Sequence, residues 1–299
     1  MRTLSDAELI LNPDGSIYHL NLHPEQVAPT IITVGDPDRV KMVSQYFDRI
    51  EYKVQKREFV THTGYVGSKR ITVLSTGIGT DNIDIVINEL DALFNIDLNT
   101  KTMRSVVRPL TFIRLGTSGC LVEDFPVDTI LVSELAIGLD SLMHYYPQSL
   151  PEEASRLQAK IRQAFSETAI LPIIPYLAVG SPSLIKQLGK DLPKGITLTA
   201  TGFYAPQGRP LRLTPNYLTL LDSFQQIDLS DLTPLPISNL EMETAGIYGL
   251  AQTLGHRAIS FNALLANRVT GEFSQQPKKT TQRMIELVLG RMENLFGGW

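Results

Sequence analysis

Two arginines follow apolar, strand-like runs at points where a bound anion could reach them. The first, Arg39, lies one helical turn into the segment VGDPDRV, and the run before it ends at Gly35. A glycine there lets backbone N–H groups approach an anion, and the start of a helix adds its positive dipole end. Helix capping explains the aspartates and the proline of this segment but not the arginine. We therefore predict a capped helix whose first turn also binds an anion.

The second arginine, Arg114, stands in the apolar run FIRLGTSG. Burying an arginine is costly unless an anionic group meets it. That group is either a bound anion or one of the chain's own carboxylates, and the sequence leaves both alternatives open. The letters Gly-Thr-Ser-Gly predict a turn after the strand, where the hydroxyl and backbone N–H of Thr117 donate to the same anion.

Two carboxylates, Glu241 and Glu243, are two residues apart in an extended segment, so they are expected to point the same way. Such a pair suits acid–base catalysis or the binding of vicinal hydroxyls, because a carboxylate accepts hydrogen bonds at both oxygens. A third interpretation is a helix N-terminus enriched in acids, since TAGIYGL follows directly.

The glycines of STGIGTDN match only part of the dinucleotide-binding fingerprint. That pattern needs a third small residue where Asn82 stands. We therefore exclude a nicotinamide or flavin enzyme.

The elements around these segments alternate between strands and helices. After the GxG turn, apolar residues recur at helical spacing from Ile83 to Phe94. Strands alternating with helices predict an α/β fold whose sheet is covered on both faces and binds ligands at the carboxyl ends of strands. Because composition does not change along the chain, we predict one domain over residues 1–299, with its core at about 17–298 and residues 1–16 as an arm.

Composition limits the classes of partner. The 299 residues are 43% hydrophobic and carry a formal net charge of -4, which argues against a dedicated nucleic-acid binder. The sequence contains neither a signal-peptide pattern nor an apolar run near the ~20 residues that span a membrane. The single cysteine, Cys120, suits a reducing compartment. We expect a cytoplasmic protein without nucleic-acid or membrane partners.

Taken in chain order, eight segments resemble the nucleoside phosphorylase family, and within it the uridine-cleaving branch. They are IYHL, VGDPDRV, REF, STGIG, FIRLGTSG, GFYAPQGR, NLEMETAG and ANRVTG. The most discriminating is GFYAPQGR, because in this branch a Phe-Tyr followed by Gln-x-Arg binds the edge of uracil. The resemblance implies a single-domain three-layer α/β/α sandwich with a mixed central sheet. It also implies a pentosyltransferase that splits uridine with inorganic phosphate into uracil and ribose 1-phosphate, with deoxyuridine and thymidine open as further substrates.

The resemblance also implies which residues hold phosphate. These are Gly35, Arg39, Arg114 and Thr117, joined by Arg57 from the neighbouring subunit. Arginine suits this task because it stays charged and forms bidentate bonds to phosphate.

For the ribose, the resemblance implies Glu243, with Met242 against the sugar and Glu241 nearby. It further implies that His19 of the partner subunit reaches the 5′-hydroxyl.

For the base, it implies stacking on Phe203, hydrogen bonds from Gln207 and Arg209, and Arg268 beside a mobile lid. Phosphate attacks the anomeric carbon as the glycosidic bond breaks, and Gln207 and Arg209 stabilise the leaving uracil anion. Arg114, Thr117 and Glu243 complete the implied catalytic group. No cofactor or metal is expected.

Competing activities of the same fold are a purine phosphorylase, a nucleoside hydrolase and a non-catalytic nucleoside-binding protein. Purine-cleaving relatives carry a Ser-Asp pair where this chain reads ALLANRVTG, and no aspartate follows Asp231. A hydrolase would not need the arginine cluster, and a non-catalytic member would be expected to lose site residues.

Two features bear on assembly. In some bacterial relatives a monovalent cation lies at the dimer interface near positions matching Glu58, Ile78 and Asn82, and the serine expected at the last position is absent. The segment 95–110 is longer than in compact bacterial hexamers and could reshape hexamer contacts. We expect a homodimer with shared active sites, and the hexamer stays open.

Overall fold

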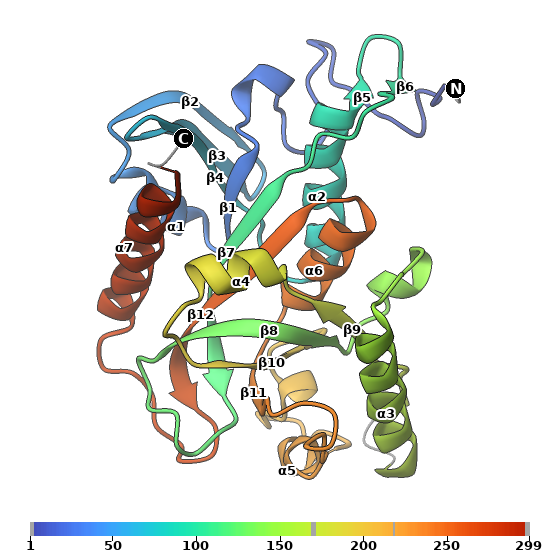
Figure 1. Cartoon of the computed structure of the whole chain (residues 1–299), viewed down its shortest axis with the longest axis vertical. Coiled ribbons are helices and arrows are strands. Elements are labelled where there is room, and N and C mark those ends of the chain that lie inside the picture. Colours follow the sequence, from blue (N-terminus) through green and yellow to red (C-terminus); the bar gives the residue numbers. More distant parts are fainter. Residues whose placement is uncertain (1–2, 169–171, 218, 297–299) are drawn as a thin grey trace.

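The computed structural model describes residues 3–168, 172–217 and 219–296. Outside this range lie residues 1–2 of the predicted arm, residues 297–298 of the predicted core and residue 299 of the predicted domain. In the described part, a mixed sheet of ten strands runs through the molecule (Figure 1). Its strands are β1 (Thr30–Val34), β2 (Arg49–Lys56), β3 (Phe59–Val66), β4 (Lys69–Ser75), β7 (Thr111–Cys120), β8 (Ile130–Gly138), β9 (Tyr176–Val179), β10 (Lys194–Thr199), β11 (Ile237–Glu241) and β12 (Arg257–Asn267).

The sheet contains both parallel and antiparallel pairs, and its antiparallel pairs include β12 with β8 in the interior. β1 lies between β4 and β7 and is parallel to both, and β12 continues the parallel run beyond β7. The hairpin of β2 and β3 adds antiparallel strands next to β4. This mixed central sheet confirms the predicted fold class.

Helices cover both faces of the sheet because strand side chains alternate between two cores. Ile31 of β1 packs in one core cluster, and its neighbour Ile32 packs in the other. The first cluster contains buried residues of α2 (Thr80–Asn95) and α6 (Thr244–Thr253). The second contains those of α1 (Pro37–Ser44), α4 (Pro182–Leu188) and α7 (Pro277–Phe296). Figure 1 shows α2 and α6 together on one side of the sheet and α1 and α7 on the other, as three layers require.

One end of the sheet closes on itself. β11 pairs with β10 and also with β7, so β7, β12, β8, β10 and β11 form a closed ring. Outward residues of this ring, such as Leu198 and Leu240, are buried against α3 (Glu152–Thr168) and α5 (Leu220–Gln225). The ring brings strands together that lie far apart in the sequence.

The predicted turn at Gly-Thr-Ser-Gly is wrong. Strand β7 continues through these residues to Cys120. β12 pairs with β7 along this whole stretch, and β11 pairs with Gly119 and Cys120. Because β12 supplies hydrogen-bond partners along this stretch and β11 adds a second side at its end, the backbone stays extended where local composition favours a turn.

The N-terminal arm packs against the body of the protein. Leu9 of the arm is buried in the same core cluster as α2. Thr3 forms a bridge with Thr102, in the small hairpin of β5 (Ile96–Asp97) and β6 (Thr102–Met103). Figure 1 shows this hairpin beside the described part of the arm, so the long segment 95–110 and the arm support each other.

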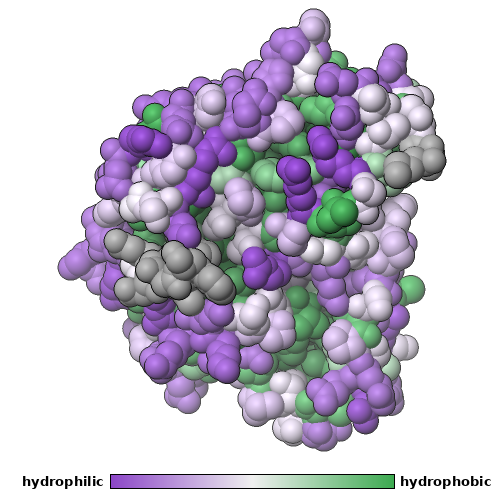
Figure 2. All heavy atoms as spheres, turned by 45° about the horizontal axis from the view of Figure 1, so that its top comes forward, coloured by the Kyte–Doolittle hydropathy of each residue, from purple (hydrophilic) through white to green (hydrophobic). Residues whose placement is uncertain are grey.

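The remaining described elements are short 3-10 helices, η1 (Pro24–Gln26), η2 (Leu142–Tyr145) and η3 (Ala205–Gln207). Figure 2 shows one face with mostly hydrophilic residues and some hydrophobic ones in the hollows between them. Within the described ranges, no helix combines the length and the apolar character needed to cross a membrane.

Candidate functional site

Arg114 lies inside the closed ring between the two predicted carboxylates. Its Nη2 atom is 2.8 Å from Oε2 of Glu241 and 2.6 Å from Oε2 of Glu243. Burial by itself lowers the pKa of Arg114, but the two carboxylates more than offset this and raise the pKa overall. Of the two alternatives that the sequence left open, the structure therefore contains the internal ion pair.

Glu243 joins three parts of the chain. Its Oε1 atom accepts a hydrogen bond of 2.8 Å from the backbone N–H of Gly79, in the turn before α2, and its Oε2 atom accepts from Arg114. Burial raises the pKa of Glu243, and the charge of Arg114 opposes that rise. The carboxylate is thus held at the start of α6 with lone pairs left for further donors.

Glu241 supports the site. Its oxygens accept hydrogen bonds from the backbone N–H groups of Glu243 and Thr244 at the start of α6, and from the hydroxyl of Thr199. This confirms the interpretation of an acid at a helix N-terminus for Glu241. Met242, between the two glutamates, is half-buried.

Arg39 lies close to Arg114. Its Nη1 atom donates to the backbone oxygen of Leu115 at 3.2 Å. Burial lowers the pKa of Arg39, and the positive charge of Arg114 lowers it further. The carboxylates of Asp36 and Glu243 act in the opposite direction on Arg39, so this region brings together two guanidinium groups and the carboxylates that compensate them.

The turn before Arg39 has the predicted capped form. The carboxylate of Asp36 accepts from the N–H of Asp38 at 2.9 Å, and Pro37 is the first residue of α1. A Cβ atom at Gly35 would lie 3.4 Å from the backbone oxygen of Gly77, so the two glycine turns approach each other. The capped helix is confirmed, and phosphate binding by Gly35 stays a prediction.

The four residues predicted to bind the base lie together. The Oε1 atom of Gln207 accepts from Nη1 of Arg209 at 2.5 Å, and Arg268 donates to the backbone oxygen of Gln207 at 3.1 Å. The guanidinium carbon of Arg209 lies 3.9 Å from the ring centroid of Phe203, whose side chain is 51% exposed. Burial and the neighbouring Arg268 lower the pKa of Arg209 to about 10. This group is therefore polar at one edge and aromatic at the other.

Strand β7 connects the Arg114 group with the group of residues predicted to bind the base. A Cβ atom at Gly116 would lie 1.8 Å from Nη1 of Arg114, and one at Gly119 would lie 3.3 Å from Cγ of Arg268. Three strand residues span roughly 10 Å, so both groups line neighbouring parts of one strand. Thr117 lies between them, half-buried on the strand and not in the predicted turn.

Two predicted residues lie apart from this site within the chain. His19 is paired with Glu89, at 2.6 Å between Nδ1 and Oε1. Arg57 occupies the turn between β2 and β3 and lies 5.9 Å from the ring centroid of Tyr18. In the described part of the chain, no hydrogen bond or ion pair joins either residue to the Arg114 group. Their proposed contribution from a partner subunit stays a prediction.

The positions that match the cation site of relatives lie near each other. A Cβ atom at Gly77 would be 2.3 Å from the Asn82 amide nitrogen and 3.2 Å from Cγ of Glu58, and Ile78 beside it is exposed. Among the residues that the structure describes, no three His, Cys, Asp or Glu side chains gather closely enough to hold a metal ion.

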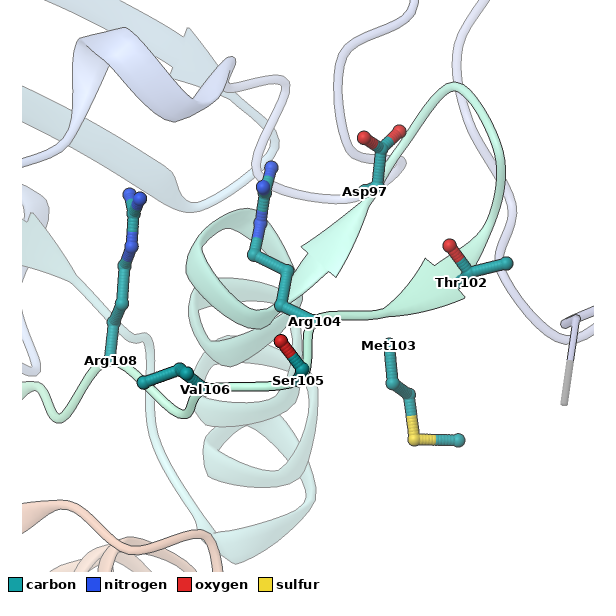
Figure 3. A pocket seen from close by; sticks show the side chains of 7 residues that line it. All are labelled: Asp97, Thr102, Met103, Arg104, Ser105, Val106 and Arg108. Atoms are coloured by element: carbon teal, nitrogen blue, oxygen red, sulfur yellow. The ribbon is translucent and has the colours of Figure 1, made fainter. Parts of the chain in front are cut away.

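A separate surface hollow of about 380 Å³ belongs to the segment 95–110 (Figure 3). Figure 3 shows the side chains of Arg104 and Arg108 extending the same way from this segment, with Met103 turned away from them. The lining residues are Asp97, Thr102, Met103, Arg104, Ser105, Val106 and Arg108. None of the predicted site residues lines this hollow.

Sequence reasoning missed two residues that contact Arg114. Nη1 of Arg114 lies 3.0 Å from Oδ1 of Asn262 and 3.4 Å from Oγ of Ser260. A signal was present, because these polar residues are two apart in the mostly apolar strand β12 and so share a face. Gly79 was also missed as a partner of Glu243.

The chain resembles known proteins along most of its own length and most of theirs. The Thermococcus kodakarensis uridine phosphorylase is 30% identical over 91% of this chain and 85% of that protein. A DeoD-type purine nucleoside phosphorylase of Colwellia psychrerythraea is 25% identical over 91% of this chain and 97% of its own length. A solved Trypanosoma brucei nucleoside phosphorylase that shows uridine phosphorylase activity superposes with a TM-score of 0.84, at 27% identity, over 96% of this chain and 99% of that one. The model of the phosphorylase superfamily matches residues 29–293, so the chain belongs to that superfamily.

Proposed function

We propose that this chain is a uridine phosphorylase, which splits uridine with inorganic phosphate into uracil and ribose 1-phosphate. One observation carries the proposal: the Gln207–Arg209 pair and the Arg114–Glu243 pair lie against the same strand, β7. The Gln207–Arg209 pair can bind the polar edge of a base, while the Arg114–Glu243 pair reaches the sugar and the phosphate. The names of the Thermococcus kodakarensis and Trypanosoma brucei relatives support the same activity.

The phosphate site in this proposal lies beside Arg39 and Arg114. Guanidinium groups form charge-assisted hydrogen bonds to phosphate, and the backbone at Gly35 and the hydroxyl of Thr117 are further donors. Glu243 accepts the ribose hydroxyls, and Met242 lies against the sugar. Glu241 holds Arg114 and the start of α6, which keeps Glu243 in place.

The leaving uracil takes up negative charge as the glycosidic bond breaks. Gln207 and Arg209 bind its polar edge, with the charge of Arg268 nearby and Phe203 against the ring. Preorganised donors aimed at a developing charge are a large term in enzyme catalysis. Arg209 stays protonated at neutral pH, since its pKa of about 10 lies well above that range.

A purine nucleoside phosphorylase is the second candidate, because DeoD-type relatives match most of the chain. Such an enzyme must protonate a purine leaving group. The strand β12 ends in Leu264, Leu265, Ala266 and Asn267, without an acid at the position of the Ser-Asp pair of purine-cleaving relatives. Pyrimidine cleavage, which can proceed through an anion held by Gln207 and Arg209, fits this chain better.

The proposal includes a homodimer in the cytoplasm, without a resident cofactor. His19 and Arg57 support the dimer, because each lies apart from the site in its own chain and would complete the site of a neighbour. The single cysteine supports a reducing compartment.

The experiment that tests the function is an assay of uracil release from uridine, with and without inorganic phosphate, beside inosine. We expect uracil only when phosphate is present, with inosine cleaved far more slowly. Release without phosphate would identify a hydrolase instead. Faster cleavage of inosine would identify the purine enzyme.

The shared site can be tested by mixing two inactive variants, Arg57→Ala and Glu243→Gln. In a two-fold dimer, each mixed dimer carries one site with both changes and one intact site, so random exchange restores about a quarter of the wild-type activity. Activity is measured after subunit exchange under mild denaturant, and each variant treated alone is the control. If the mixture stays as inactive as its components, the site does not use residues of two subunits.

A further inference from the structure

The interior of the closed ring is polar, although it is buried. On β10 and β11, Leu198 and Leu240 face outward into a core cluster, whereas Thr197 and Asn239 are also fully buried but face the other way. Burying polar side chains is unfavourable unless each finds a hydrogen-bond partner. An apolar interior would be the simpler way to fill this space.

The polar side chains form one continuous chain of hydrogen bonds that begins at Arg114. Nη1 of Arg114 donates to Oδ1 of Asn262 at 3.0 Å, and Nδ2 of Asn262 donates to Oγ of Ser133 at 2.9 Å. Ser133 and Thr197 share a bond of 2.5 Å between their hydroxyl oxygens. Thr197 donates to Oδ1 of Asn239 at 2.8 Å. The chain ends where Nδ2 of Asn239 donates to Oγ of Ser118 at 2.9 Å.

Arg114 determines which groups donate and which accept in this series of hydrogen bonds. A guanidinium can only donate, so Asn262 must present its oxygen to Arg114 and its amide nitrogen to Ser133. The hydroxyl of Ser133 therefore accepts from Asn262 and can donate a hydrogen bond to the hydroxyl of Thr197. Each group in the series is oriented by its neighbour. Because the oxygen of Asn262 is held in this way, the guanidinium of Arg114 has one preferred position.

We infer that Asn262 is a positioning residue of the enzyme, anchored by Ser133, and that it directs the Arg114 guanidinium toward Glu243. The inference rests on the proposed function of the Arg114–Glu243 pair. Neither Asn262 nor Ser133 needs to touch a substrate for this role, because both act through Arg114. Without Asn262, the hydrogen bond left to Nη1 of Arg114 among the described residues is the 3.4 Å contact with Ser260.

Two variants and their combination test this role. We expect Ser133→Ala to lower kcat/KM for uridine phosphorolysis by about three- to tenfold, and Asn262→Leu by about ten- to a hundredfold, from the loss of one neutral or one charge-assisted hydrogen bond. The KM for phosphate should rise in both. Since Ser133 acts through Asn262, the double variant should be no less active than Asn262→Leu alone.

Ser44→Ala is the matched control. Ser44 is also a buried serine with a hydrogen bond, of 2.8 Å to Nδ1 of His62, but that bond lies outside the ring. This variant should lose stability in thermal unfolding as Ser133→Ala does, while its kcat/KM stays at the wild-type value. Calorimetry with inorganic phosphate gives a second readout, in which Ser133→Ala and Asn262→Leu should raise Kd and Ser44→Ala should not.

The outcomes separate the inference from the proposed function. Multiplicative losses in the double variant would show that Ser133 does not act through Asn262, and equal losses of kcat/KM in Ser44→Ala would show that the effects follow from lost stability alone. Either result would overturn the inference. If Asn262→Leu does not fold, unchanged phosphate binding and turnover in Ser133→Ala would overturn the inference. If the wild type releases no uracil, the proposed function fails, and the phosphate Kd values still decide whether Asn262 positions Arg114.

Discussion

Changing Glu243 to glutamine is expected to lower kcat/KM for uridine by at least about a hundredfold. The change weakens the hydrogen bonds that the carboxylate accepts from Arg114 and from the backbone N–H of Gly79, which are charge-assisted and contribute about 1.5–3 kcal/mol each. The substitution keeps the shape of the side chain but removes the charge that Arg114 meets at 2.6 Å. The neutral amide also accepts ribose hydroxyls less strongly. Glu241 still pairs with Arg114, so the fold should persist. Initial rates of uracil release at saturating phosphate measure the effect.

Glu286→Gln makes the same chemical change at a distant position. Glu286 lies on α7 and accepts a hydrogen bond from the hydroxyl of Tyr46. Its variant should retain the wild-type kcat/KM. If Glu243→Gln stays within about threefold of the wild type while circular dichroism shows both variants folded, then Glu243 does not hold the ribose.

Replacing Arg209 by methionine is expected to lower kcat for uridine by about 10²–10³-fold, the range seen when one donor to a developing anion is removed. Methionine keeps much of the apolar stem but cannot donate to the leaving base. The effect should be smaller with 5-fluorouridine, because fluorine withdraws electron density and stabilises the leaving anion without help from the protein. Comparing kcat for the two substrates in wild type and variant measures this difference.

Arg212→Met, on the same loop, is the matched control. Arg212 is exposed and lies three residues beyond Arg209, so its loss should leave both rates unchanged. An equal loss of Arg209→Met on both substrates would mean that Arg209 holds the base without stabilising its charge. An unchanged kcat would show that the base-binding role assigned to Arg209 is wrong.

The sequence by itself determined the features that depend on residues close together in the chain. Apolar residues from Ile83 to Phe94 at helical spacing predicted a helix, and α2 spans Thr80–Asn95. The letters Asp-Pro-Asp predicted the cap of α1, and the Asp36 carboxylate accepts from Asp38 as expected. Phe203, Gln207 and Arg209 lie within one short loop, so their proximity could also be predicted.

Only the tertiary structure decided which partners Arg114 has. Glu243 is 129 positions from Arg114, and Asn262 is 148 positions away, so local pattern could not choose between an internal ion pair and a bound anion. The choice follows from the pairing of β11 with β7, which closes the ring and brings both glutamates beside β7.

The same closure overrode a local preference. Gly-Thr-Ser-Gly favours a turn when only neighbouring residues are considered, but β12 pairs with this stretch along its length and β11 pairs with its end. Burial then required hydrogen-bond partners for every polar side chain inside the ring, which selected Asn262 and Ser133 around Arg114. Local propensity contributes less than about 1 kcal/mol per residue, whereas the burial of unpaired polar groups costs more, so non-local pairing decided the geometry of the site.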